Sequence, residues 1–145
     1  MTKAIRISAI GGPEVMEYVD VDLPAPGRGE ALIRQHACGL NYIDVYFRMG
    51  TYPQQLPAGL GMEGAGVVEA VGEGVTHIKP GDRVAYAGRP PGAYAEARVL
   101  PADVLVKLPG AISFETAAAM MLQGLTVQYL FRRTFRLQGL SLIHI

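Results

Sequence analysis

The sequence predicts a mainly β fold: a small, partly open barrel of short strands with helices at its C-terminal end. Short stretches alternate between apolar and polar residues, which is typical of strands that bury one face. The 145 residues include 18 glycines and 10 prolines. Turn clusters of these residues divide the alternating stretches about every ten residues, a spacing found in small barrels.

Each expected strand is bounded by such a turn. The first strand ends before Gly11-Gly12-Pro13, and two later strands flank the turns at Gly72-Glu73-Gly74 and Pro80-Gly81-Asp82. Proline and glycine punctuate strands because neither residue supports a continuous ladder. The expected strands are residues 3–8, 15–19, 30–36, 67–71, 83–86, 92–99 and 104–107.

The pattern becomes helical after Pro109. Ser113 is a suitable N-cap, and the acidic Glu115 follows in the first turn, where it complements the helix dipole. Residues 117–122 are good helix formers. We expect Gly124 to interrupt this helix and residues 125–133 to start another.

Composition excludes several classes of function. Thirteen basic residues balance thirteen acidic ones without a long run of one sign, so neither a nucleic-acid partner nor a membrane surface is expected. No run of about 18 apolar residues suggests a membrane span. The single cysteine, Cys38, rules out an intramolecular disulfide and fits a cytoplasmic protein. We expect it to be a small buried hydrophobe.

The stretch Gly61–Val84, GMEGAGVVEAVGEGVTHIKPGDRV, carries the strongest motif. It resembles the GroES-like catalytic domain of medium-chain dehydrogenases and reductases, with its G-H-E-x-x-G-x-V, V-G-x-x-V and G-D-R-V segments. The zinc enzymes of that family have a zinc-binding His where this chain has Met62, and a thioether is a poor Zn²⁺ ligand. Glu63 keeps the family's acid, for which we expect a structural hydrogen bond.

A second motif, CGLNYIDVYFRMGTYP at 38–53, is similar to the zinc-independent quinone oxidoreductase branch, which includes zeta-crystallin. Asn41 aligns with the first zinc-binding Cys of the zinc enzymes. The cysteine-rich loop that holds their structural zinc has no counterpart. The resemblance therefore implies an enzyme without a metal site.

The resemblance also implies a reaction and the residues that take part in it. NADPH would bind between this domain and a nucleotide-binding domain, and its hydride would pass to a small-molecule quinone or activated enone. The parent enzyme would be a homodimer. Tyr46 and Tyr52 would be the catalytic residues, as hydrogen-bond donors to the substrate oxygen. The cofactor-binding residues would be Asn41, Tyr42, Ile43, Asp44, Val45, Tyr46, Thr126 and Tyr129.

Each of these residues also has a structural alternative. Asn41 and Asp44 are common helix caps and turn residues, the tyrosines could be ordinary barrel packing, and Thr126 and Tyr129 could share a helix core face. Two other functions remain open for the whole protein: an enoyl or enone reductase of the same family, and a non-catalytic binding or structural barrel.

We expect three parts along the chain. Residues 1–112 form the GroES-like domain, and residues 113–139 form helices that lead toward the family's Rossmann nucleotide-binding domain. No strand, glycine-rich turn and helix of that domain follow, so the chain is interpreted as an N-terminal fragment. The last six residues, LSLIHI at 140–145, match a translated sequencing adapter and are expected to be non-native; the alternative is the first strand of the missing domain.

Overall fold

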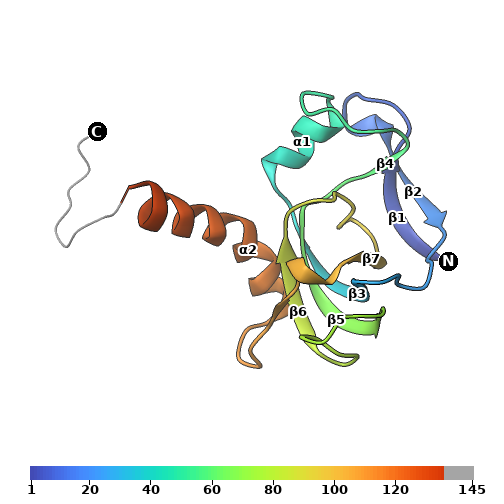
Figure 1. Cartoon of the computed structure of the whole chain (residues 1–145). Coiled ribbons are helices and arrows are strands. Elements are labelled where there is room, and N and C mark those ends of the chain that lie inside the picture. Colours follow the sequence, from blue (N-terminus) through green and yellow to red (C-terminus); the bar gives the residue numbers. More distant parts are fainter. Residues whose placement is uncertain (136–145) are drawn as a thin grey trace.

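The computed structural model describes residues 1–135, and Figure 1 shows two antiparallel sheets from which one long helix projects. The small sheet has the order β2–β1–β4, and the large sheet has the order β7–β3–β5–β6–β8. Their strands are β1 (Thr2–Ile7), β2 (Met16–Val21), β3 (Glu30–Gly39), β4 (Ala58–Gly59), β5 (Glu63–Val71), β6 (Arg83–Ala87), β7 (Ala97–Pro101) and β8 (Val106–Lys107). Short 3₁₀ turns, η1 (Pro13–Val15) and η2 (Ala102–Val104), precede β2 and β8.

Main-chain contacts ahead of β7 join the two sheets. The Ile5 N–H donates to the Tyr94 carbonyl at 2.7 Å, and the Glu96 N–H donates to the Lys3 carbonyl at 2.9 Å. Ala4 and Ala95 form an isolated bridge between them. The sheets thus meet along one seam without closing, which confirms the predicted mainly β, partly open barrel.

Two groups of buried apolar side chains fill this barrel. One lies between the strands of the large sheet and the loops that cover it, and the other lies beneath the short helix α1 (Tyr42–Arg48). Burial of such side chains is the main driving force for the fold. The first group includes Ile33, Val68, Val84, Tyr86 and Leu100, and the second includes Ile7, Phe47, Ala58, Leu60 and Met62.

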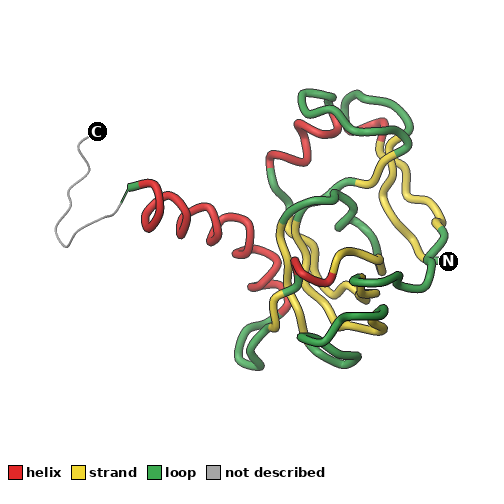
Figure 2. The backbone as a smooth tube through the Cα atoms, in the orientation of Figure 1, coloured by secondary structure: helices red, strands yellow, loops and turns green. Residues whose placement is uncertain are grey.

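The helix α2 (Phe114–Tyr129) starts as predicted, because the Ser113 side chain accepts the Thr116 N–H at 3.1 Å. It packs on the outer face of the large sheet through Ala117 and Ala118, which are buried against Ala65 and Ala85. Beyond this contact α2 leaves the body of the protein, and a π-helical turn, η3 (Leu130–Thr134), ends it (Figure 2).

The predicted interruption at Gly124 is wrong, because α2 runs through this residue without a break. A single glycine inside a helix costs only about 1 kcal/mol relative to alanine. Strong helix formers on both sides outweigh that cost.

Two predicted strands are shorter than expected. Residues 92–96 form bridging contacts rather than a strand, and β7 starts only at Ala97. Gly92 has a φ of 136°, so the chain is turning where the alternation predicted a strand. Likewise, η2 occupies Ala102–Val104, which leaves only Val106–Lys107 as β8.

No helix within residues 1–135 is long and apolar enough to cross a bilayer. The predicted adapter-derived tail at 140–145 and the end of the predicted 113–139 segment lie outside the described residues.

Candidate functional site

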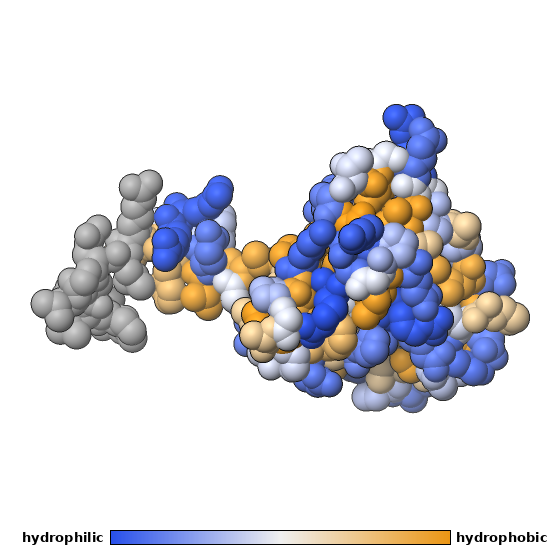
Figure 3. Space-filling model, turned by 90° about the horizontal axis from the view of Figure 1, so that it is seen from below, coloured by the Kyte–Doolittle hydropathy of each residue, from blue (hydrophilic) through white to orange (hydrophobic). Residues whose placement is uncertain are grey.

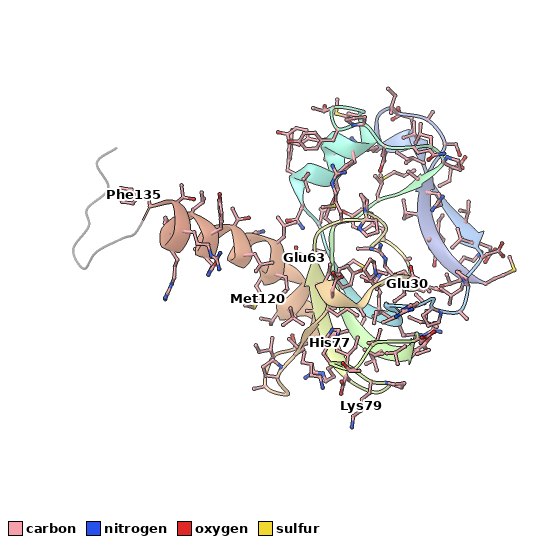
Figure 4. The ribbon with its side chains drawn as sticks, viewed as in Figure 1. Glu30, Glu63, His77, Lys79, Met120 and Phe135 are labelled. Carbon is pink, nitrogen blue, oxygen red and sulfur yellow. The ribbon has the colours of Figure 1, made fainter. Side chains whose placement is uncertain are left out.

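Glu63 lies where α2 meets the large sheet, at the start of β5 (Figure 4). Its side chain is 1% exposed. One carboxylate oxygen accepts the Asn41 Nδ2 amide at 2.7 Å, and the other accepts the Leu122 backbone N–H at 2.8 Å. Glu63 therefore joins α1, β5 and α2, and the predicted structural hydrogen bond is confirmed.

Asn41 is the N-cap of α1 and is itself buried, with 8% of its surface exposed. Its backbone N–H donates to Asp44 Oδ2 at 3.1 Å, which is the acidic half of a capping box. Its side-chain nitrogen faces Glu63. The structural role that was left open for Asn41 is therefore present. In the other half of the box the Asn41 side chain accepts the Asp44 N–H, so its amide oxygen lies on the side away from Glu63 and faces the first turn of α1.

Asp44 also has a structural role. The Tyr94 hydroxyl donates to Asp44 Oδ2 at 2.7 Å, while Asp44 Oδ1 is buried without a hydrogen-bond partner. Burial raises the pKa of the Asp44 carboxyl above its ordinary value, and the hydrogen bond from Tyr94 opposes this shift. The pKa of Tyr94 is raised as well, chiefly by burial and also by the hydrogen bond to Asp44. Asp44 therefore has the helix-capping role that was given as its alternative.

Three tyrosines form an exposed aromatic run on α1 and the loop after it. The rings of Tyr42 and Tyr46 are 5.2 Å apart and nearly perpendicular, and those of Tyr46 and Tyr52 are 5.5 Å apart. Phe47 packs beneath, with its ring 5.6 Å from that of Tyr52. Such edge-to-face contacts fix the rings, while Tyr46 and Tyr52 keep 38% and 41% of their surface exposed. The two predicted catalytic residues therefore lie side by side at the surface.

The other two predicted cofactor-binding residues on α1, Ile43 and Val45, are partly buried. Ile43 is half-buried and packs against the apolar cluster of Phe47 and Met62. Val45 is half-buried too.

Thr126 and Tyr129 lie on the projecting half of α2. The Thr126 hydroxyl donates to the Leu122 carbonyl at 2.9 Å, one helical turn from the contact with Glu63. Tyr129 is 58% exposed. Neither residue packs into a helix core, so the structure does not support that alternative, but it does not bring them against α1 either.

A cavity of about 350 Å³ opens between the end of β3 and α2. Glu63 contributes to its lining, so the cavity adjoins the network around Asn41. Its volume is at the small end of the range for ligand sites. Its lining residues are Ala37, Cys38, Gly39, Leu40, Glu63, Glu115, Ala118, Ala119 and Gln123.

The prediction that Cys38 is buried is wrong. Cys38 is exposed, and its thiol donates to the Ala93 carbonyl. The pairing of β3 with β5 is irregular between Gln35 and Ala37. Such a bulge shifts the alternation, so the facing of Cys38 does not follow from the residues before it.

The two positions that align with zinc ligands are used in other ways. Met62 is 6% exposed within the apolar cluster under α1, and the Asn41 amide is held by Glu63. Among residues 1–135, no three His, Cys, Asp or Glu side chains gather closely enough to hold a metal ion.

Comparison with known proteins connects this arrangement to a family. The model of the alcohol dehydrogenase GroES-like domain matches residues 27–110. The chain belongs to this family. Quinone oxidoreductase from Pseudomonas aeruginosa is 57% identical over 140 residues, which are 96% of this chain and 43% of that protein.

Solved structures agree with this assignment. Quinone oxidoreductase from Pseudomonas syringae superposes with a TM-score of 0.93 at 58% identity, over 95% of this chain and 43% of that one. The Escherichia coli quinone oxidoreductase complexed with NADPH gives a TM-score of 0.92 at 47% identity, over 94% of this chain and 42% of that one. This GroES-like chain thus spans less than half the length of the relatives that it matches.

Two members of the site have no signal in the sequence. Tyr94 reaches Asp44 across 50 residues, and the Leu122 contact uses a backbone N–H whose residue type carries no information. Only the position of Glu63 in its motif pointed to this part of the network.

Proposed function

We propose that this chain forms one wall of the catalytic cleft of a zinc-independent NADPH:quinone oxidoreductase. The observation that carries the proposal is the exposed tyrosine run beside Asn41, in which the Tyr46 ring packs on Tyr52 and the Tyr52 ring packs on the buried Phe47. The identity of 57% to a quinone oxidoreductase and the NADPH complex of a second relative support it.

When bound, NADPH supplies the hydride. Asn41 would hold the carboxamide of the nicotinamide, and Tyr42, Ile43, Asp44, Val45 and Tyr46 would shape the surface beside it. Thr126 and Tyr129 would approach the cofactor from the projecting half of α2. Since Asp44 is 4% exposed, its contribution is to hold α1 rather than to touch the ligand.

Tyr46 and Tyr52 would stack beside a flat quinone and donate hydrogen bonds to its oxygen. Two electrons and one proton enter as hydride, and one further proton completes the hydroquinone. Negative charge develops on the substrate oxygen, where donors placed in advance stabilise it. The same arrangement serves an activated enone, whose reduction has the same hydride chemistry. The proposed parent is a cytoplasmic homodimer.

A chimera tests this proposal. Residues 1–135 of this chain replace the matching part of the Pseudomonas aeruginosa quinone oxidoreductase, and NADPH oxidation is followed with a panel of quinones and enones. We expect quinone reduction at a rate within about tenfold of the relative's, since the cleft is complete. A folded chimera that reduces none of the panel would reject the proposal. The 145-residue chain alone is expected to bind NADPH weakly and to turn over little.

Two variants of the chimera locate the substrate. Tyr46→Phe and Tyr52→Phe remove one hydroxyl each and keep the ring. We expect each to lower kcat/KM for the quinone by about 5- to 20-fold, as for the loss of one hydrogen bond. Tyr18→Phe is the matched control, because Tyr18 on β2 is 60% exposed and bonds to Glu96 instead. Equal effects of all three changes would exclude this surface.

A further inference from the structure

The Glu63 carboxylate makes two contacts in which it can only be the acceptor. Asn41 Nδ2 and the Leu122 N–H both donate, at 2.7 and 2.8 Å, and each meets a different oxygen. The Leu122 N–H lies inside α2, where an uninterrupted helix would offer it only the Ala118 carbonyl. The Glu63 side chain therefore accepts a backbone N–H from within α2, at the point where this helix leaves the sheet.

The close approach of β3 keeps Glu63 in this place. A Cβ on Gly39 would lie 2.2 Å from the Ala118 carbonyl oxygen and 2.4 Å from Glu63 Oε2. The glycine thus permits the carboxylate, β3 and α2 to meet with no intervening atom. Figure 4 shows Glu63 at this junction, near Met120 on the same part of α2.

From this geometry we propose that Glu63 is a positioning residue that sets which end of the Asn41 amide faces the ligand. Since Glu63 accepts at both oxygens, the end of Asn41 that faces it must be the nitrogen. The amide oxygen then faces the Asp44 N–H and keeps a second lone pair for the ligand. A ligand group at that oxygen must donate a hydrogen bond. The carboxamide of a nicotinamide has such a donor, whereas a quinone oxygen has none. This inference rests on the proposed function for the identity of the ligand.

A glutamine at position 63 cannot satisfy both donors as the chain stands. If its carbonyl faces the Leu122 N–H, its amino group faces Asn41 Nδ2, and two donors meet. The Asn41 amide must then turn over, which gives its oxygen to Gln and its nitrogen to the ligand. The double change Asn41→Asp with Glu63→Gln restores an oxygen on the ligand side, since Asp has an oxygen at both ends and the number of carboxylates is unchanged.

Nuclear magnetic resonance of the 145-residue chain tests the orientation without any activity. We expect the Asn41 side-chain amide and the Leu122 amide to exchange slowly in the wild-type chain. In Glu63→Gln the Leu122 amide stays protected and the Asn41 amide loses protection. Equal protection of Asn41 in both proteins would overturn the proposal. If Glu63→Gln does not fold, N41D/E63Q decides: a protected Gln side-chain amide supports the proposal, and an unprotected one or an unfolded chain contradicts it.

Kinetics of the chimera test the consequence. We expect Glu63→Gln to raise KM for NADPH about tenfold with a smaller change in kcat, because the lost bond holds the cofactor before and during reaction alike. N41D/E63Q should return KM to within about threefold of the wild-type value. A purely structural role would lower stability and leave KM for NADPH unchanged in all three proteins. If the wild-type chimera is inactive, the proposed function fails, and the resonance measurement alone decides the role of Glu63.

Discussion

A methyl group added at Gly39 should separate α2 from the sheet. The ideal Cβ of Gly39→Ala lies 2.2 Å from a backbone oxygen of α2 and 2.4 Å from a carboxylate oxygen of Glu63. Ordinary contacts of this kind are longer than 3 Å, so the helix must move by close to 1 Å. That movement would weaken both hydrogen bonds of Glu63 and loosen the packing of Ala117 and Ala118.

The cost follows from these contacts. Overpacking in a tight core costs about 1–3 kcal/mol, and a weakened bond to a buried carboxylate adds about 1 kcal/mol. We therefore expect Gly39→Ala to lower the free energy of unfolding by about 2–4 kcal/mol. Urea unfolding of the 145-residue chain, followed by far-ultraviolet circular dichroism, measures this change as a lower midpoint.

Gly124→Ala is the matched control, because a Cβ at Gly124 meets no atom within 4 Å. In the middle of α2 this change should stabilise the chain by up to about 1 kcal/mol. A Gly39→Ala chain within 0.5 kcal/mol or so of the wild type would refute the close approach of β3 and α2.

Three further predictions concern the supports of the site. Tyr94→Phe removes the donor to the buried Asp44 carboxylate and should cost about 1–3 kcal/mol in urea unfolding; an unchanged midpoint would contradict the 2.7 Å bond. Because the pKa of Asp44 is raised in the folded chain, the protonated Asp44 side chain stabilises the fold. This contribution to the free energy of unfolding is fully present below a pH of about 4 and is lost as pH rises through the folded pKa. Relative to Asp44→Asn, the wild type should therefore lose stability with rising pH, and parallel pH profiles would refute this. Arg83 donates to three carbonyls of the loop before α2 and lies 4.4 Å over the Phe114 ring. Arg83→Met should speed proteolysis in that loop several-fold, whereas Arg34→Met, which removes only an exposed ion pair, should not.

The sequence predicted the parts of this fold that depend on local pattern. Alternation located the strands β1 and β6, and the Ser113 cap located the start of α2. The helix α1 was not predicted, since its seven residues are too few to show a period. Asn41 with Asp44 three residues later was the available signal, but both were predicted as cofactor-binding residues, with capping as the alternative.

The rest of the site depends on distant contacts and could not be predicted. The burial of Asp44 and its bond to Tyr94 come from chain crossings 50 residues apart. The exposure of Cys38 follows from the irregular pairing of β3 with β5, and no residue type in the sequence predicts that irregularity. The aromatic run was predicted as residues, but its edge-to-face arrangement comes from the turn that returns Tyr52 to α1, where the Tyr52 N–H donates to the Tyr46 carbonyl at 3.2 Å.

The far end of α2 has an apolar surface of its own. Figure 3 shows apolar side chains among the polar ones along the projecting helix. The exposed apolar residues of this segment include Leu125, Val127, Leu130 and Phe131. Apolar surface of this kind is usual at a contact with another part of a protein.

The aromatic run on α1 also allows ligand binding to be followed by the intrinsic fluorescence of the chain. The sequence has seven tyrosines and no tryptophan, so its ultraviolet emission comes from tyrosine alone. Three of the seven form this exposed run, with ring centres 5.2 and 5.5 Å apart. A flat aromatic molecule that stacks on these rings would quench a large share of the tyrosine emission, without any label. A molecule that binds in the seam between the sheets would quench the emission of these three tyrosines less, so a fluorescence titration distinguishes the two locations.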